Sequence, residues 1–356
     1  MRSGCAGVGV TSVYQPIIDV ATGVTAGYEA LARFNAYPER NPEKWFTAAR
    51  EHGCHAELEA VALRTALRSR PDLPTNTFLT VNVSPDLLLN EQVRSIWRGE
   101  GDLTGLVIEL TEQAHIESYG ALEGDLTALR AAGAMIAIDD AGSGYSGLRH
   151  LLELRPAIIK LDRELVENID LDESKLALAE MVGTFAGRID AWLLAEGIER
   201  AGELDALASL GVPLVQGYYL ARPGDPWPTL NPEAAQSLVQ RQNTPVTNSV
   251  RELIEVVPTA TNGEEAAQQF AIDHIHTVVM GDADAHPLAA HTPDSIFLGT
   301  SERGMRVNVD TPVDEALRRA ITRDLTHRYE PLMCTDNAGR FLGAVRIERL
   351  IRAAIG

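Results

Sequence analysis

The sequence predicts an α/β protein: a modified TIM (β/α)8 barrel with one antiparallel strand, followed by a smaller α+β domain. Short apolar runs rich in strand-forming residues recur through the N-terminal part of the chain, and helix-like stretches separate most of them. Strands that alternate with helices in this way form a parallel sheet covered on both faces. Because such runs are repeated through about 225 residues, the sheet is expected to close into a barrel.

The predicted strands follow one another along the chain. They cover residues 14–20, 24–34, 78–83, 106–110, 134–138, 157–161, 192–195 and 212–220. Only Ala21, Thr22 and Gly23 separate the first two runs. A connection this short joins antiparallel strands and cannot contain a crossover helix, so one strand is expected to run against its neighbours.

A change in composition marks the end of the barrel. Residues 222–250 contain five prolines and several amide side chains but little strand pattern, and are predicted to form a linker with at most one helix. The length of 356 residues also favours two domains. The predicted domains are a barrel at residues 1–235 and a second domain at 250–356, joined by a linker at 236–249.

Two similar units follow each other in the second domain. In the first, a helical stretch at 264–275 precedes a strand at 277–280; in the second, a helical stretch at 313–324 precedes a strand at 330–336. Each unit closes with a short strand and a helix, at 287–297 and 343–354. This pattern indicates an internal repeat of about 50 residues.

Charge and cysteine content limit the partners and the compartment. The chain has 31 Lys and Arg against 50 Asp and Glu, a net charge of -19, so binding to a nucleic-acid polymer by bulk electrostatics is not expected. Cys5, Cys54 and Cys334 are few and far apart, which argues against a disulfide framework or a cysteine metal site and favours a reducing cytosol. No apolar run is long enough for membrane insertion, and a cytoplasmic protein is expected.

Polar residues occur in or at the end of each later strand of the predicted barrel. They are Glu29, Asn82, Glu109, Asp139 with Asp140, Lys160, Glu196 and Gln216, in chain order. Side chains at the carboxyl ends of barrel strands meet at one rim, where active sites lie. Taken one at a time, these residues have ordinary structural explanations. The two aspartates could cap a turn, Lys160 could extend its charged end to solvent, and Gln216 could be a surface amide. The agreement of seven strands favours a single site.

Carboxylates that converge in this way repel one another unless cations hold them. Oxygen ligands without His or Cys suit Mg²⁺ or Mn²⁺ and do not suit a dedicated zinc site. Two adjacent aspartates allow one side chain to bridge two ions while its neighbour binds the second. Two metal ions per site, arranged for in-line attack on a phosphodiester, are therefore expected.

These residues resemble the EAL phosphodiesterases, which cleave the bacterial second messenger cyclic di-GMP to linear pGpG. The Glu-Ala-Leu signature stands at Glu29-Ala30-Leu31. The other motifs follow in order: Tyr14-Gln15-Pro16-Ile17, Asn82-Val83-Ser84-Pro85, Glu109-Leu110-Thr111-Glu112, Asp139-Asp140-Ala141-Gly142, Lys160-Leu161-Asp162, Ala195-Glu196-Gly197-Ile198-Glu199 and Gln216-Gly217-Tyr218. The resemblance covers about residues 13–223.

The resemblance implies a role for each matched position. The metal ligands would be Glu29, Asn82, Glu109, Asp139, Asp140 and Glu196, with Asp139 shared between two ions. Lys160 would orient the attacking water with support from Gln216, and Glu29 and Glu196 would take part in catalysis through the metals. The substrate contacts would be Gln15, Arg33, Asp162 and Tyr218. Glu112 would anchor the loop that follows the paired aspartates.

One position departs from the family pattern. The usual Asp-Asp-Phe-Gly sequence has Ala141 in place of the aromatic residue. A loop without that ring would weaken the second metal site. Two functions therefore stand: a cyclic di-GMP phosphodiesterase, or a receptor that binds cyclic di-GMP without hydrolysing it and signals to a protein partner. Replacing Glu29 with alanine would abolish cleavage in the first case and change only affinity in the second.

The second domain resembles a tandem pair of CBS modules, most clearly at residues 328–345. Such pairs commonly bind adenine nucleotides. Ligand-binding modules place a Thr or Ser, and then an Asp, after the glycine equivalent to Gly343. Here Arg346 stands in place of the Thr or Ser, and Arg349 in place of the Asp. The first module has Ala289 for that glycine, and its polar residues are Thr292 and Asp294. The arginines suit phosphates. The alternative is a packing or dimerisation domain, and a homodimer is expected from either resemblance.

Overall fold

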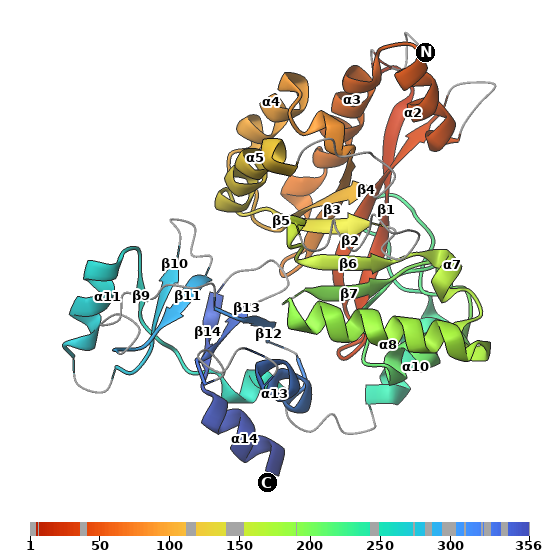
Figure 1. The fold of residues 1–356 in the computed structure, drawn as a ribbon. Helices are drawn as coiled ribbons and strands as arrows, with labels where there is room; N and C mark the ends of the chain where they lie inside the picture. Colours follow the sequence, from red (N-terminus) through yellow and green to blue (C-terminus); the bar gives the residue numbers. More distant parts are fainter. Residues whose placement is uncertain are drawn as a thin grey trace. The chain divides into compact units, whose positions relative to one another are not determined.

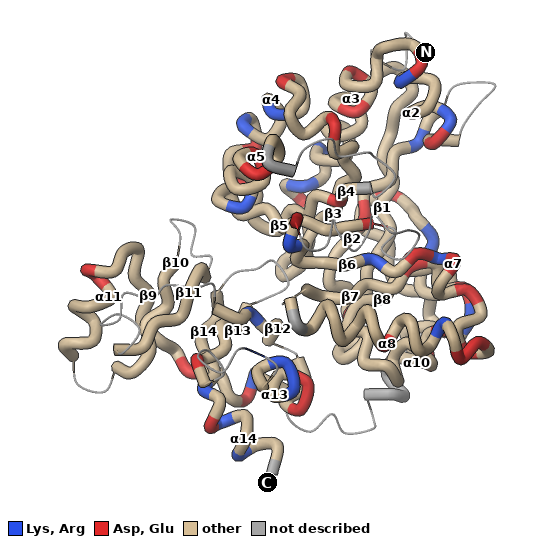
Figure 2. Tube along the Cα trace, in the orientation of Figure 1, with Lys and Arg blue, Asp and Glu red and all other residues tan. Residues whose placement is uncertain are grey.

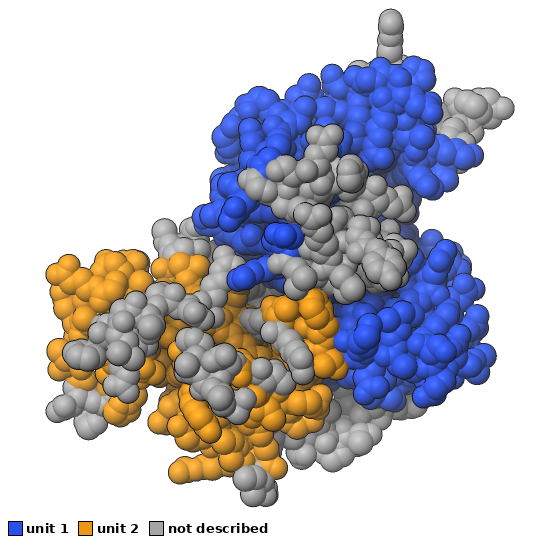
Figure 3. Space-filling view, viewed as in Figure 1, with its two compact units in different colours: residues 1–183, 191–239 blue, residues 184–190, 240–356 orange. Residues whose placement is uncertain are grey.

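The computed structural model describes residues 5, 7–35, 41–111, 119–139, 153–189, 191–242, 249–272, 275–281, 287–293, 304–309, 311–321, 323, 329–335 and 341–355. The chain forms two compact units (Figure 3). Unit 1 consists of Met1–Gly183 and Ala191–Val239, and unit 2 of Thr184–Asp190 and Gln240–Gly356. Residue 235, the predicted end of the barrel domain, lies within helix α10 (Pro232–Gln242). The predicted domain limits stay a prediction.

Unit 1 is a closed barrel of eight strands in sequential order (Figure 1). The strands are β1 (Val10–Asp19), β2 (Thr25–Phe34), β3 (Phe78–Val83), β4 (Leu106–Thr111), β5 (Met135–Asp139), β6 (Ile158–Leu161), β7 (Trp192–Ala195) and β8 (Leu214–Val215). Strand β1 is antiparallel to both β2 and β8, and the other neighbouring pairs are parallel. The predicted barrel with one reversed strand is confirmed.

Helices that lie between the barrel strands along the chain, or follow the last of them, carry many charged residues (Figure 2). They are α2 (Pro42–Glu51), α3 (His55–Leu67), α4 (Glu91–Glu100), α5 (Tyr119–Ala131), α7 (Arg163–Val166), α8 (Glu173–Arg188), α9 (Ala201–Ser209) and α10. Helix α4 shows why these segments are helical. Asn90 caps its first turn by accepting a bond from Gln92 N, and Val93, Ile96 and Trp97 form its buried stripe.

An apolar layer fills the barrel below its carboxyl-end rim. It consists of Ile17, Ala26, Phe78, Val107, Ala137, Ile158, Leu194 and Leu214, all at most 3% exposed. Gly27 leaves room for the largest member, because a Cβ atom there would lie 2.4 Å from the Phe78 ring. The layer closes the barrel interior beneath the polar residues, as expected for a barrel with a packed core.

Unit 2 contains two three-stranded sheets of matching topology. The first has β9 (Thr259–Ala260), β10 (Val278–Gly281) and β11 (Pro287–His291); the second has β12 (Arg306–Asn308), β13 (Leu332–Thr335) and β14 (Phe341–Val345). In each, the middle strand pairs in parallel with the strand before it and antiparallel with the strand after it. This shared order agrees with an internal repeat.

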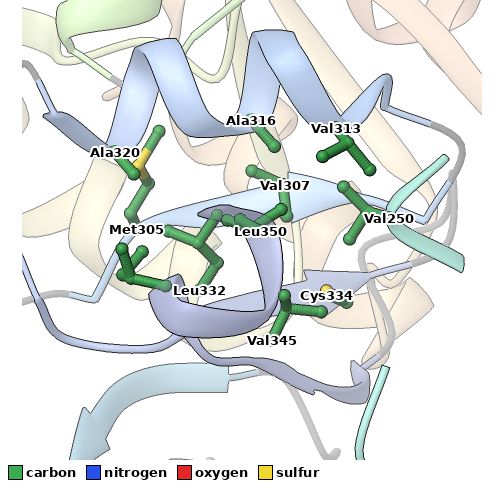
Figure 4. Packing of buried hydrophobic residues seen from close by; sticks show 11 residues of the cluster. Val250, Met305, Val307, Val313, Ala316, Ala320, Leu332, Cys334, Val345 and Leu350 are labelled. Atoms are coloured by element: carbon green, nitrogen blue, oxygen red, sulfur yellow. The ribbon is translucent and has the colours of Figure 1, made fainter. Parts of the chain in front are cut away.

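Helices cover these sheets in the same order. Helix α11 (Gly263–Phe270) lies between β9 and β10, α13 (Val313–Ile321) lies between β12 and β13, and α14 (Ile347–Ile355) follows β14. Val313, Ala316 and Ala320 recur on one face of α13 and pack with Val307 and Leu350 (Figure 4). A separate small core contains Ala260, Ala266 and Val278. Each repeat therefore has its own apolar cluster.

Two local expectations differ from the structure, and one contact between cysteines was not anticipated. The predicted strand at 212–220 shortens to Leu214–Val215, because the chain leaves the barrel after Gln216 in a series of turns. Strands β9 and β12 were not expected, since runs of two and three residues carry no period-two signal. Cys5 and Cys54, distant in sequence, have their Sγ atoms 2.7 Å apart as free thiols.

The described helices include none that is both long and apolar enough to cross a membrane.

Candidate active site

Lys160 lies among four carboxylates at the carboxyl ends of the strands. Its Nζ atom is 2.5 Å from Glu196 Oε1, 2.9 Å from Glu109 Oε2, 3.3 Å from Asp139 Oδ1 and 3.6 Å from Glu29 Oε1. The Lys160 and Glu109 side chains are 1% and 0% exposed. One ammonium group thus faces several carboxylates in a place that water barely reaches.

Amide side chains continue this cluster around Glu29. Asn82 Nδ2 donates to Glu29 Oε1 at 3.1 Å, and Gln216 Nε2 donates to Glu29 Oε2 at 2.7 Å. Gln216 Nε2 also donates to Gln15 Oε1 at 3.1 Å, and Gln15 Nε2 donates to Ala221 O at 3.0 Å. The structure therefore brings together seven of the predicted catalytic or metal-binding residues and one predicted substrate contact: Glu29, Asn82, Glu109, Asp139, Lys160, Glu196, Gln216 and Gln15.

Strand alternation explains why these side chains meet. Val107, Ile158 and Leu214 belong to the apolar layer, and Glu109, Lys160 and Gln216 each follow one of them by two positions. Residues two apart on a strand point to the same face. The polar cluster is therefore the next layer of the barrel interior, directly above the apolar one.

A close approach of two turns fixes Gln216. The Gln216 N–H donates to Ala195 O at 2.8 Å, and Ile198 N donates to Gln216 O at 3.1 Å. A Cβ atom at Gly217 would lie 2.1 Å from Ile198 O, so only glycine fits there. The turn after β7, which begins with Glu196, and the turn after β8 are consequently locked together.

Burial and mutual repulsion shift the acid groups of the cluster. Burial raises the pKa of Glu109 to about 8. The positive charge of Lys160 opposes this shift, whereas the negative charges of Glu29 and Asp139 add to it. Burial likewise raises the pKa of Glu196 well above its usual value. The pKa of Lys160 is raised because its four acidic neighbours outweigh its own burial. The cluster contains more negative charge than one ammonium group neutralises.

The chemistry of this donor set suits a hard divalent cation. Glu109 Oε1 and Gln216 Oε1 are buried and accept no hydrogen bond from any residue that the structure describes. Cations of this kind prefer oxygen ligands, and four carboxylates here share the ammonium group of Lys160. Within the described ranges, however, no three acidic, His or Cys side chains are arranged to hold a metal ion. The carboxylates converge instead on Lys160.

Three predicted substrate contacts lie outside this cluster. Arg33, further along β2, donates from Nη1 to Ala32 O at 2.9 Å. Asp162 caps α7 by accepting a bond from Glu164 N at 2.9 Å. Tyr218 is 45% exposed, and the Arg222 guanidinium carbon lies 4.5 Å from its ring centre. Asp140, Ala141 and Glu112 lie outside the described residues.

The stacked Arg222 was not among the predicted site residues. A cation over an exposed aromatic ring offers both a charge and a flat surface to a ligand. Sequence reasoning assigned Arg222 to the start of the linker because prolines follow it. The sequence signal that could have pointed to Arg222 is its position shortly after Tyr218 of the Gln-Gly-Tyr motif.

Comparison with known sequences identifies the barrel. The profile described as the EAL domain matches residues 4–223. The chain belongs to the EAL domain family. One relative is the cyclic di-GMP phosphodiesterase PA2567 of Pseudomonas aeruginosa, 30% identical over 226 residues that make up 59% of this chain and 38% of that protein. The chain spans less than half of the length of this relative, and 26% of the length of another.

Solved EAL structures share the same fold. A standalone versatile EAL protein of Vibrio cholerae O395 in its c-di-GMP-bound form has a TM-score of 0.54 and 26% identity, and covers 64% of this chain and 97% of that one. The Klebsiella pneumoniae BlrP1 complex with manganese and c-di-GMP has a TM-score of 0.54 and 29% identity, over 61% of this chain and 57% of that one. Neither coverage reaches the whole of this chain.

Proposed function

We propose that this protein is a metal-dependent cyclic di-GMP phosphodiesterase that hydrolyses its substrate to linear pGpG. The single observation that carries the proposal is the cluster of Glu29, Glu109, Asp139 and Glu196 around Lys160 at the rim of an EAL barrel. Relatives named as phosphodiesterases and an EAL structure with manganese and c-di-GMP support the same chemistry.

The proposed cofactor is a pair of Mg²⁺ or Mn²⁺ ions. Bound there, the ions would supply Lewis acidity and lower the pKa of an attacking water. The residues that would hold them are Glu29, Asn82, Glu109, Asp139, Asp140 and Glu196. Their carboxylates have the excess negative charge that two divalent ions would offset.

Residues of the chain itself would position the reactants. Lys160 would hold the attacking water beside the phosphorus, and its raised pKa keeps the ammonium group a donor at neutral pH. Gln216 would keep Glu29 in place through its bond to Oε2. The P–O bond to one ribose would break as the new P–O bond forms. The attacking water would lose a proton to solvent, and the leaving ribose oxygen would take a proton from solvent.

Substrate recognition is proposed for the rim around this centre. Gln15, Arg33, Asp162 and Tyr218 are the candidate contacts, and Arg222 joins them because it stacks on Tyr218. A guanidinium fork suits two phosphate oxygens, and an aromatic face suits a guanine base.

A second function rests on the composition of the loop after β5. With Ala141 in place of the usual aromatic residue, the protein would bind cyclic di-GMP without hydrolysing it and would act as a receptor for a protein partner. Formation of pGpG separates the two functions. The purified full chain is incubated with cyclic di-GMP and Mn²⁺ or Mg²⁺, and the products are separated by chromatography.

Three variants make this experiment specific. Glu29→Ala and Asp140→Ala should lose product formation, whereas Glu123→Ala, an exposed change on α5, should not. Product from the wild type in metal-free buffer, or from Glu29→Ala at the wild-type rate, would contradict the proposal. Binding of cyclic di-GMP without any pGpG would support the receptor.

We propose that unit 2 is a CBS-like pair that regulates or dimerises the barrel. Its two matching sheets support this reading. Arg346 and Arg349 were suggested as phosphate contacts, but both donate to Glu255 Oε1, at 2.8 Å from Arg346 Nη2 and 2.9 Å from Arg349 Nη1. A nucleotide phosphate would have to displace this carboxylate. Thr292 and Ala289 lie at β11, and Asp294 is outside the described residues.

Adenine nucleotides test the regulatory proposal. Thermal shifts of the full chain with AMP, ADP or ATP should be larger for Glu255→Gln than for wild type if phosphate competes with Glu255. A homodimer is proposed for the full chain, and light scattering measures it. A cytoplasmic location is also proposed, and fractionation of cells with an antibody to the chain tests it.

A further inference from the structure

A second buried polar cluster joins α3 to the end of β3. The Glu59 side chain, on α3, is 5% exposed, and His55 and Ser84 are each 8% exposed as residues. Ser84 directly follows β3 and stands two residues after Asn82. None of these three residues belongs to the carboxylate cluster around Lys160.

Glu59 bonds both the backbone and the side chain of Ser84. Ser84 N donates to Glu59 Oε1 at 2.5 Å, and Ser84 Oγ donates to Glu59 Oε2 at 3.0 Å. A carboxylate that accepts bonds from a backbone N–H and a hydroxyl in a buried place forms a strong, directional anchor. An apolar residue at position 59 would remove the carboxylate that accepts from both donors of Ser84.

Cationic and imidazole groups complete the anchor. Arg50 Nη2 donates to Ser84 Oγ at 3.2 Å, and His55 Nε2 lies 3.2 Å from the same oxygen and 3.4 Å from Glu59 Oε2. The other ring nitrogen, His55 Nδ1, lies 3.9 Å from Asp86 Oδ2. Together these contacts hold the backbone at the end of β3 against α3.

The anchor acts on a short, fixed segment. Asn82 pairs with Glu109 on the neighbouring strand, and its Nδ2 donates to Glu29 Oε1 at 3.1 Å. Ser84 begins the 3-10 turn at Pro85–Leu87, where the strand ends. A displacement of Ser84 would rotate the last residues of β3 and with them the Asn82 amide.

We propose that Glu59 is a positioning residue that aims Asn82 at the active site through Ser84. This inference rests on the proposed function, in which Asn82 supplies an amide oxygen to a divalent cation. Groups that orient metal ligands from behind typically change metal affinity or activity by about 10-fold to 100-fold when they are removed. Glu59 belongs to this class because it accepts both hydrogen bonds from Ser84, which stands two residues beyond the ligand.

The test measures Mn²⁺ binding by the full chain without substrate, by isothermal titration calorimetry. Glu59→Ala should raise the Kd for Mn²⁺ by about 10-fold or more. Ser84→Ala, which keeps the backbone N–H bond to Glu59, should raise it less. Glu57→Gln, an exposed acid on the same helix, should leave it unchanged. The positioning role is overturned if a folded Glu59→Ala or Glu59→Gln protein binds Mn²⁺ as tightly as wild type.

Hydrolysis kinetics separate this inference from the proposed function. At saturating Mn²⁺, Glu59→Gln should recover most of the wild-type kcat while needing more metal for half-maximal rate. A purely structural loss would lower kcat at every metal concentration in step with the fraction unfolded, and that result would overturn the role. If the wild type binds Mn²⁺ through Glu29 but forms no pGpG, the proposed phosphodiesterase activity is wrong, and the role of Glu59 is still tested by Mn²⁺ binding. If Mn²⁺ binding does not depend on Glu29, both the proposed function and the role of Glu59 are wrong.

Discussion

Lys160 Nζ lies 2.9 Å from Glu109 Oε2, and both side chains are almost completely enclosed. A buried ion pair is costly to break from one side, because the remaining charge has no partner. Here the remaining carboxylates would also lose the ammonium group that separates them.

Lys160→Met should therefore abolish most activity without removing any proposed metal ligand. The loss of the ammonium group that would position the attacking water predicts a fall in kcat of about 10²-fold to 10⁴-fold. The measurement is the rate of pGpG formation at saturating Mn²⁺. Lys175→Met, on α8, is the control and should retain the wild-type rate. A Lys160→Met rate within a few-fold of wild type would remove this lysine from the mechanism.

Gly217→Ala should disturb the site through the backbone. The added Cβ would meet Ile198 O at 2.1 Å and Ile198 N at 2.2 Å, so the turns after β7 and β8 must separate. Overpacking of this kind costs about 1 to 3 kcal/mol of the free energy of unfolding. Denaturant unfolding measures the cost, and the rate of pGpG formation should fall as Gln216 moves.

Gly124→Ala provides a matched control for that change. Gly124 lies within α5, and a Cβ there has nothing within 4 Å. Alanine in a helix interior is favoured over glycine, so this variant should be more stable than wild type by about 0.5 to 1 kcal/mol. Equal effects of the two substitutions would argue against the close approach at Gly217.

Glu255→Gln should reduce stability in a pH-dependent way. Burial raises the pKa of Glu255, but bonds and charge from Arg346 and Arg349 outweigh it and lower the pKa below 4.5. A carboxyl with a depressed pKa stabilises the fold above its unfolded pKa of about 4.5 and loses that contribution as pH falls through the folded value. The difference in Tm between wild type and Glu255→Gln should thus be largest at neutral pH and decrease as the pH is lowered.

The neighbouring acid Glu252, which is exposed, supplies the comparison for that experiment. Glu252→Gln should have a small effect on Tm at every pH. If the Glu255→Gln gap grew toward acid pH, the ion pairs with the two arginines would not be the source of the stabilisation.

Thiol chemistry should distinguish the three cysteines. Burial raises the pKa of Cys334 to about 12 and that of Cys5 to about 11, so both thiolates are scarce at neutral pH, but Cys334 is also buried from reagents in the folded protein. Cys5 and Cys54 lie Sγ to Sγ at 2.7 Å and are only partly buried. Treatment with a disulfide reagent should cross-link Cys5 to Cys54, seen as a loss of two hydrogens by intact mass, and should spare Cys334 until the chain is unfolded.

The barrel and the core of its site were predictable because both follow from strand alternation. Glu109 and Lys160 each stand two positions after an apolar residue on the same inward face, and that spacing is written in the sequence. The resemblance to the EAL family then supplied the roles proposed for them.

Contacts set by the packing of distant segments were not predictable in this way. The anchor of Glu59 on Ser84 joins α3 to the end of β3, and Cys5 meets Cys54 because the chain before β1 packs near the start of α3. Strands as short as β9 leave no periodic signal. The cap that Asp162, a predicted substrate contact, forms on α7 was not predicted either.

The apolar layer beneath the carboxylates has an electrostatic consequence. Ile158, Leu194 and Phe78 form a floor of low polarizability beneath the charged residues. Low-dielectric walls focus field lines toward the high-dielectric solvent, so the field of these charges is directed to the open rim. A small cation near the mouth of the barrel would be attracted along the barrel axis. Larger side chains in the apolar floor would change how far into the barrel the cation is attracted.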